Sequence, residues 1–539
     1  MKTDKVYDYI VIGSGFGGSV SAMRLAEKGY SVLVIEKGKW WKAEDFPKSN
    51  WNLGKFLWVP PLRWFGIMKM DFFKEVLVLS GTGVGGGSLV YANTHMIPKE
   101  AFWTNPIWSH IKNWKDVMAP YYEQARFMLG SSKYMREFPE DKMMEEVAKE
   151  MDQADTYKAV DYVGVYFGDT RKEKDPYFKG LGPLRKGCTE CAGCMVGCRE
   201  NAKNTLDKNY LHFAQDYGAE ILAETVVKKI EHINGEYIIY TESQTNWWKK
   251  NKQVFRSKGL VVSGGVLGTL KLLLEQKHIH KTLPNLSEKL GENILTNSEM
   301  IAGVGGAPTK MNNGIAISRV FNPDENTHIE LCKYPNGSGA MMRLGVMAAG
   351  DGNGFVRTAK MLGNMISQPI NSFRFFFEPK VAEKSIILLI MQSLPNAMKL
   401  HLKSGLFGTS LKFDNDAGTK VPSFIPVGQD VVYRYAQKAN AVPMNAFSEV
   451  MFSMSTTAHI LGGCPMGKTK EEGVVDEYFR VHGYPNMYIL DGSIVPANLG
   501  VNPSFTITAL SEYAMDNVPA KEGVTRATLA ERLEAIEQY

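Results

Sequence analysis

Residues 10–18 read Ile-Val-Ile-Gly-Ser-Gly-Phe-Gly-Gly, and this stretch decides the expected fold. An apolar run that predicts a buried strand leads directly into the spacing Gly-x-Gly-x-x-Gly, at Gly13, Gly15 and Gly18, and a helical pattern follows. Gly13 permits a tight turn, Gly15 lets the backbone approach a pyrophosphate, and Gly18 lets helix and strand pack closely. The unpaired N–H groups at the helix N-terminus favour an anion. The stretch is therefore typical of a dinucleotide site.

The segment after this helix supports the same interpretation. A second apolar strand is expected over residues 31–35, and it ends in Glu36. An acidic side chain at that strand tip can accept hydrogen bonds from ribose hydroxyls and disfavours a 2′-phosphate. Strand, helix, strand and acid in this order predict a Rossmann-like unit.

Residues 80–93 form a second glycine-rich stretch, Ser-Gly-Thr-Gly-Val-Gly-Gly-Gly-Ser-Leu-Val-Tyr-Ala-Asn. Five glycines among these residues disfavour helix and strand, and they suit a loop that lies against a flat or anionic group. Two separate glycine-rich contacts favour a long ligand held along its length, more like FAD than NAD. A plain flexible loop is the alternative. A further strand–glycine–helix crossing over residues 259–274 is expected to return the chain to the nucleotide domain.

The composition is that of an ordinary globular protein of 539 residues, 44% hydrophobic and 22% charged. The length suits about two to four domains. The net charge of +5 is too weak to argue for nucleic acid or for an acidic partner. No apolar run of about 18 residues predicts a transmembrane helix, and the first strand is expected to begin by Val6, which leaves no room for a signal peptide. We therefore expect a cytoplasmic protein.

Four of the six cysteines fall close together, at Cys188, Cys191, Cys194 and Cys198. The spacing C-x2-C-x2-C-x3-C is that of bacterial ferredoxins, whose thiolates hold a 4Fe–4S cluster. Arg199 stands where those ferredoxins have a proline, and only one such motif occurs, so a 3Fe–4S site is also open. Structural zinc is a further alternative, and so are four thiols that are reduced or joined in disulfides.

The C-terminal part of the chain holds the residues with the clearest catalytic potential. His459 begins the glycine turn His-Ile-Leu-Gly-Gly-Cys, and an apolar strand further on ends in Asp491. Asn502 and Pro503 open a helix whose N-terminus can direct donors at a negatively charged group.

Residues 360–380 combine large apolar side chains with three basic ones, Lys360, Arg374 and Lys380. A core helix and loop is the favoured interpretation. An amphipathic face that touches lipid is the alternative, and it would make peripheral membrane contact part of the function.

Four blocks, residues 13–36, 81–93, 262–274 and 459–510, resemble the glucose–methanol–choline (GMC) oxidoreductases. Within that family the chain is most similar to the bacterial cholesterol oxidase branch, because of Gly-Gly-Gly-Ser-Leu-Val over residues 85–90 and the turn that begins at His459. The resemblance implies an α/β fold (α+β overall), with a Rossmann-like FAD-binding domain and a substrate-binding domain built on a β-sheet.

The resemblance also implies a discontinuous domain organisation. The FAD-binding domain is expected over residues 1–40, 75–98, 200–305 and 454–520. The substrate-binding or cap domain is expected over residues 41–74, 99–199 and 306–453, with a Cys-rich loop at 187–199, and a C-terminal helix over residues 521–539.

The family's cofactor contacts can be carried over onto matching positions. The resemblance implies that FAD is bound by Gly13, Gly15, Phe16, Gly18, Glu36, Gly81, Gly85, Gly87, Ser88, Asn93, Val227, Gly264, Asp491, Gly492, Asn502 and Pro503. The sequence departs from the family at Tyr91, where many members have an asparagine. It also has no certain counterpart of the glutamate that cholesterol oxidases use for steroid isomerisation. Glu330 is the nearest candidate, and we expect it to be a surface or paired carboxylate.

The function that the resemblance implies is oxidation of an apolar alcohol, sterol-like or long-chain, with hydride transfer to flavin N5. His459 would accept the hydroxyl proton, and Asn502 would orient the alcohol oxygen. Electrons would then pass through the cysteine loop to a quinone or cytochrome, or directly to oxygen, and the loop slightly favours the first route. The alternatives are a pyridine-nucleotide-dependent reductase and an electron-transfer protein that binds flavin or a cluster.

Overall fold

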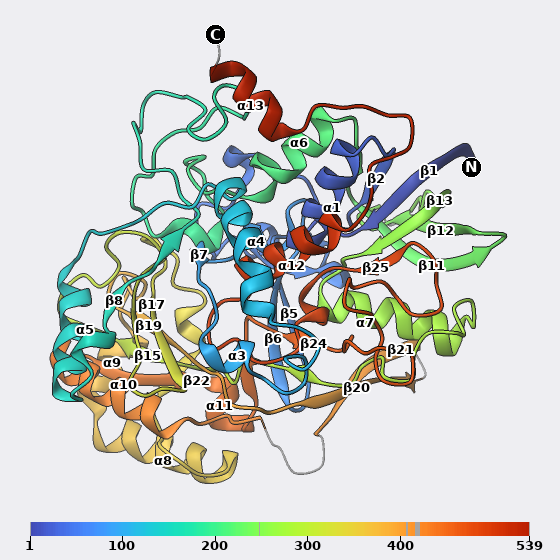
Figure 1. Ribbon diagram of the computed structural model, residues 1–539. Helices are drawn as coiled ribbons and strands as arrows, with labels where there is room; N and C mark the ends of the chain where they lie inside the picture. Colours follow the sequence, from blue (N-terminus) through green and yellow to red (C-terminus); the bar gives the residue numbers. More distant parts are fainter. Residues whose placement is uncertain (1, 247, 406–407, 416–420, 538–539) are drawn as a thin grey trace.

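The structure is a computed structural model that describes residues 2–246, 248–405, 408–415 and 421–537 (Figure 1). The expected domains also include residues 1, 247, 406–407, 416–420 and 538–539, which lie outside the described residues.

The first large sheet contains the N-terminal strand and has the order β10-β2-β1-β13-β12-β11, with β25 also paired to β13. Its strands are β1 (Lys2–Ile12), β2 (Val32–Ile35), β10 (Glu220–Leu222), β11 (Thr225–Ile233), β12 (Glu236–Ser243), β13 (Gln253–Val262) and β25 (Met487–Ile489). The strands β10, β2, β1, β13 and β25 run parallel, whereas β11 and β12 form an antiparallel hairpin. This is the parallel sheet that the first glycine motif predicts.

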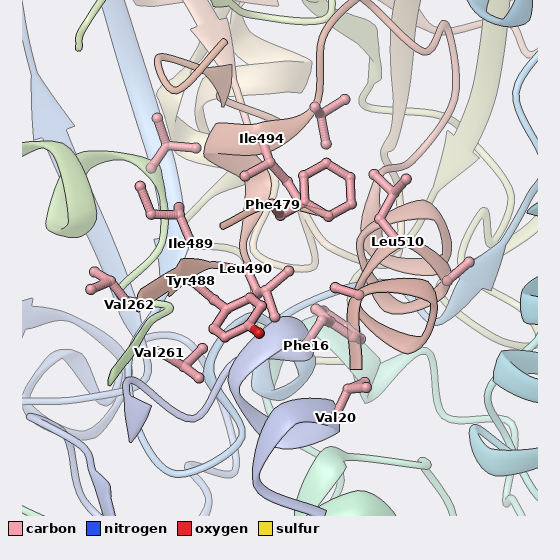
Figure 2. Close-up of a cluster of buried hydrophobic side chains, with 14 of the residues drawn as sticks. Phe16, Val20, Val261, Val262, Phe479, Tyr488, Ile489, Leu490, Ile494 and Leu510 are labelled. Atoms are coloured by element: carbon pink, nitrogen blue, oxygen red, sulfur yellow. The ribbon is translucent and has the colours of Figure 1, made fainter. Parts of the chain in front are cut away.

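The helix α1 (Phe16–Glu27) packs on this sheet, and α12 (Ser504–Asp516), from the opposite end of the sequence, packs against α1. Figure 2 shows the core beside them, where Phe16 and Val20 of α1 meet side chains from β13, from β25 and from α12. The guanidinium of Arg24 on α1 donates to the carboxylate of Glu512 on α12 at 2.7 Å, and it also pairs with Glu27. The nucleotide-binding half is therefore built from segments that are distant in the sequence.

The second large sheet is antiparallel and has the order β18-β22-β15-β19-β17-β16-β8. Its strands are β8 (Lys158–Ala159), β15 (Met300–Gly305), β16 (Ile317–Phe321), β17 (Thr327–Cys332), β18 (Gly345–Met347), β19 (Ile386–Gln392) and β22 (Val442–Ala446). One face of this sheet is packed under α5 (Pro139–Glu150) and α10 (Pro426–Lys438). The residues of β15 fall in the range expected for the FAD-binding domain, yet they hydrogen-bond within this second sheet.

Smaller sheets and further helices connect the two halves. The strands of the smaller sheets are β3 (Trp58–Val59), β4 (Trp64–Phe65), β5 (Met68–Phe72), β6 (Val76–Gly81), β7 (Thr94–His95), β9 (Tyr162–Val163), β14 (Ile294–Leu295), β20 (Met398–Gly405), β21 (Gly408–Asn415), β23 (Ser455–Thr457) and β24 (Leu461–Gly462). The other helices are α2 (Leu53–Phe56), α3 (Glu100–Trp103), α4 (Trp114–Met128), α6 (Tyr210–Asp216), α7 (Val266–Leu274), α8 (Gly354–Ser367), α9 (Pro369–Phe376), α11 (Phe447–Phe452) and α13 (Leu529–Glu537).

The expected fold class is confirmed, because a Rossmann-like parallel sheet stands beside a mostly antiparallel one. In the part of the chain that the structure describes, no helix has the length and apolar character needed to cross a bilayer.

Candidate active site

The turn between β1 and α1 has the close packing that its glycines predict. Gly13 has φ +96°, and a side chain there would clash with the carbonyl of Ser263 at the end of β13. A side chain on Gly18 would likewise clash with the carbonyl of Gly13. Gly15 differs, because no atom lies within 4 Å of the position that its Cβ would take, and the residue lines a cleft.

This nucleotide cleft lies at the carboxyl ends of β1, β2 and β13. The predicted cofactor-binding residues that line it are Gly13, Gly15, Glu36, Gly81, Gly87, Val227 and Gly264. Like Gly15, Gly265 and Gly268 line the cleft with nothing within 4 Å of the position that a Cβ would take. Bare backbone from two glycine-rich turns therefore forms a cradle, and a long dinucleotide such as FAD fits it.

Glu36 stands at the tip of β2, as the sequence predicts. One carboxylate oxygen accepts from the backbone N–H and hydroxyl of Ser14, at 3.1 and 2.8 Å, and the other accepts from the N–H of Gly38 at 2.9 Å. These bonds hold the carboxylate at the edge of the cleft, where a ribose would lie.

The other predicted cofactor-binding residues lie outside the cleft lining. They are Phe16, Gly18, Gly85, Ser88, Asn93, Asp491, Gly492, Asn502 and Pro503. The Ser88 hydroxyl donates to the carbonyl of Gly85 and accepts from the N–H of Leu206. The Asp491 carboxylate accepts from the N–H and hydroxyl of Ser493 and from Thr269. In these contacts Ser88 and Asp491 shape loops around the cleft.

His459 and Asn502 come together, although they come from different segments. His459 follows β23, and Asn502 precedes α12; their Nε2 and Nδ2 atoms lie 3.4 Å apart. Asn502 is buried, and the side chain of His459 is 11% exposed. The Oδ1 atom of Asn502 is buried with no hydrogen-bond partner among the described residues, so it is available to a ligand.

Glu299, which the sequence did not indicate, binds the Nδ1 side of the histidine ring. One of its carboxylate oxygens bonds to Nδ1 of His459, and the other accepts from the N–H of Ala458 at 2.8 Å. Because the carboxylate faces Nδ1, that nitrogen carries the proton, and Nε2 presents its lone pair on the side of Asn502. Glu299 lies in a coil before β15, and no sequence motif marks it.

The charge around His459 favours its protonated form. Burial by itself favours the neutral ring, but the negative charge and hydrogen bond of Glu299, with a further contribution from Glu330, raise the pKa of His459 above its ordinary value. The imidazole is therefore a stronger proton acceptor than a free histidine.

Glu330 is paired and completely buried rather than on the surface. It accepts from Nδ2 of Asn502 at 3.2 Å, and its other oxygen lies 3.4 Å from Nε2 of His328. The Glu330 carboxylate and the His459 imidazole therefore flank the Asn502 amide, and they fix its orientation.

An apolar cavity reaches this site from the second sheet. It is lined by β15, β19 and β22 on one side and by β6 on the other, and it extends to Ala458, next to His459. Most of the side chains that line it are apolar, as a hydrocarbon ligand requires.

The cysteine loop does not have the arrangement of a cluster site. In the ranges that the structure describes, no three His, Cys, Asp or Glu side chains lie together as metal ligands would. Cys194 is buried, Cys188 and Cys198 are half-buried, and Cys191 is exposed. The predicted iron–sulfur site is therefore not supported by the geometry.

Comparison with known proteins gives the class. Residues 11–39 match an NAD(P)-binding Rossmann-like domain, and residues 184–294 and 403–511 match GMC oxidoreductase domains. The chain is 40% identical to a cholesterol oxidase of Acinetobacter baumannii over 528 residues, 96% of this chain and 95% of that protein. It is also 40% identical to a cholesterol oxidase of Mycobacterium tuberculosis over 540 residues, 97% and 92% of the two chains.

More distant proteins agree. A long-chain-alcohol oxidase of Arabidopsis thaliana, FAO4B, is 24% identical over 579 residues, which cover 97% of this chain and 69% of that protein. The crystal structure of pyridoxine 4-oxidase from Mesorbium loti has the same fold, with a TM-score of 0.60 at 13% identity over 95% of this chain and 99% of that one.

These findings define an oxidoreductase that acts on the CH–OH group of alcohols. The chain belongs to the GMC oxidoreductase family, in the branch that is similar to cholesterol oxidases.

Proposed function

We propose that this protein binds FAD and oxidises an apolar alcohol, sterol-like or long-chain, to the carbonyl compound, with His459 as the base. The observation that carries the proposal is the position of the His459 Nε2 atom, which lies beside Asn502 where the apolar cavity ends. When bound, FAD supplies the acceptor for the hydride that leaves the alcohol carbon.

The residues of the site accept the proton and orient the substrate. Nε2 of His459 accepts the hydroxyl proton, and Glu299 stabilises the imidazolium that results. The Asn502 amide, fixed by Glu330, donates from Nδ2 to the alcohol oxygen, which leaves the hydroxyl proton directed at Nε2 of His459. The apolar walls exclude water from the reacting hydroxyl.

We propose oxygen as the electron acceptor. The spacing of the four cysteines slightly favours transfer through this loop to a quinone or cytochrome, but the loop geometry in the described residues does not support a cluster. The relatives named oxidases support the direct route. A reductase that uses a pyridine nucleotide would not need the His459–Asn502 pair.

A sterol added under nitrogen is expected to bleach the flavin absorbance of the purified holoprotein, and the same reaction in air should yield peroxide in a ratio of about one to one. The matched control is Gly15→Val, whose side chain would fill the open cradle and leave the protein colourless but folded. Bleaching by NADPH instead of the sterol, or electron delivery only to a quinone, would contradict the proposal.

We further infer that α8 and α9 contact lipid, which makes peripheral membrane contact part of the proposal. Phe355, Leu362 and Ile366 are exposed along one face of α8, and Ile370 and Phe373 are exposed on α9. This apolar face argues against the core interpretation of the segment. The opposite side of α9 carries Phe375, which lines the substrate cavity, so the lipid face and the cavity share one helix. The cytoplasmic location stays a prediction.

The double variant Ile366→Ser/Phe373→Ser is expected to bind anionic phospholipid vesicles about tenfold or more weakly than the wild type, because two large side chains lose their burial in the bilayer. Co-sedimentation with the vesicles measures this. Leu184→Ser, which changes an exposed leucine elsewhere, is the control and should bind as the wild type does. A wild-type protein that stays in the supernatant would contradict the inference.

A further inference from the structure

The cavity-facing row of β19 begins with a polar residue. Side chains alternate along a strand, so Ile387 and Leu389 face the cavity, while Leu388 and Ile390 belong to the core under α10. Ile386, at the start of the strand, belongs to that core and also borders the cavity. Ser385 directly precedes β19 and shares the row of Ile387 and Leu389. It lines the cavity, as those two residues do.

The surroundings of Ser385 are apolar. Its hydroxyl lies beside Gly305 of the neighbouring strand β15 and near the ring of Phe375. The space is so tight that a Cβ atom on Gly305 would lie 3.2 Å from the Ser385 oxygen and would clash with the ring. Ser385 is 2% exposed, and its hydroxyl has no hydrogen-bond partner within the described residues. A buried hydroxyl without a partner is unfavourable, so a residue of this kind in an apolar cavity points to a ligand that satisfies it.

The strand register shows how Ser385 is placed along the sheet relative to the catalytic end. Glu330, which bonds to Asn502, lies opposite Leu389 in the β17–β19 pair. Ser385 is four residues from Leu389 along the strand, which is about 13 Å at the usual rise of a β-strand.

We propose that Ser385 forms a second polar subsite, which binds an oxygen atom at the far end of the substrate. The substrate class is then an apolar alcohol that carries a second hydrogen-bonding oxygen at the end remote from the hydroxyl that reacts. A serine hydroxyl both donates and accepts, so the distant group is a ketone, a hydroxyl or an ester. This inference rests on the proposed alcohol oxidation.

The test compares two steroid alcohols that differ only at the far ring, where one carries a ketone and the other a hydrocarbon side chain. For the wild type, kcat/KM is expected to be about tenfold higher for the ketone, because one buried hydrogen bond strengthens binding by about that factor. Ser385→Ala should raise KM for the ketone by a similar factor, leave kcat alone, and leave the hydrocarbon substrate unchanged.

The matched control is Ser448→Ala, which removes a hydroxyl of the same cavity that is already bonded to Thr456. It should affect both steroids equally. An unchanged substrate ratio in Ser385→Ala, with flavin content and Tm as in the wild type, would overturn the subsite and leave the proposed function standing. A wild-type holoprotein that oxidises neither steroid would overturn both.

Discussion

His459→Ala is expected to lower kcat by about a hundredfold or more, because the alcohol then has no base for its hydroxyl proton. The flavin content should stay as in the wild type, since His459 does not line the nucleotide cleft. Single-turnover reduction of the flavin by substrate under nitrogen measures the affected step directly, without oxygen chemistry.

The control for this variant is His110→Ala, which changes an exposed histidine whose ring hydrogen-bonds to the carbonyl of Pro106, far along the chain from His459. It should reduce the flavin at the wild-type rate. A rate of flavin reduction near that of the wild type in His459→Ala would remove the histidine from the proposed mechanism.

Glu299→Gln is expected to lower kcat by about an order of magnitude or more and to move the pH profile. An amide can donate to Nδ1 of His459, which places the ring proton on Nε2 and removes the acceptor that the alcohol needs. The carboxylate raises the pKa of His459, so kcat/KM of the wild type should rise with pH as the imidazolium loses its proton above the ordinary histidine range.

The direction of the pH shift in Glu299→Gln distinguishes an electrostatic effect of Glu299 on His459 from a purely structural one. Without the negative charge the imidazolium is less stable, so the rising limb of the Glu299→Gln profile should lie at lower pH than that of the wild type. Glu299→Asp keeps the charge and should keep the limb near its wild-type position. If the rising limb of the pH profile does not move in Glu299→Gln, the carboxylate does not set the pKa of His459 and contributes only to the structure.

Local patterns predict the nucleotide half well. Gly13 and Gly18 are needed for contacts within a short turn, and Glu36 follows the adjacent strand. Their spacing along the sequence is therefore enough to predict where they lie relative to one another. His459 and Asn502 could be paired only through the family resemblance, because nothing local indicates that their side chains meet.

Contacts between distant segments could not be predicted. Glu299 lies 160 residues from His459 and follows no motif, so its hydrogen bond is visible only in the folded chain. The spacing of Cys188–Cys198 limits how far apart the four thiols can lie, but it does not tell whether they point toward one another. The predicted cluster site is not supported by the arrangement of these side chains in the described residues. Helical periodicity in 354–376 marks an apolar face without showing whether protein or lipid covers it.

The pairing of β25 with β13 also bears on how the protein is made. During synthesis the ribosome delivers α1 and β13 long before Met487, so the edge of the parallel sheet waits unpaired while more than two hundred further residues emerge. Phe16 and Val20 lack their contacts with α12 for longer, because that helix follows later still. We therefore expect the first sheet to become complete only late in translation, and its unpaired edge to be a site where chaperones bind the nascent chain.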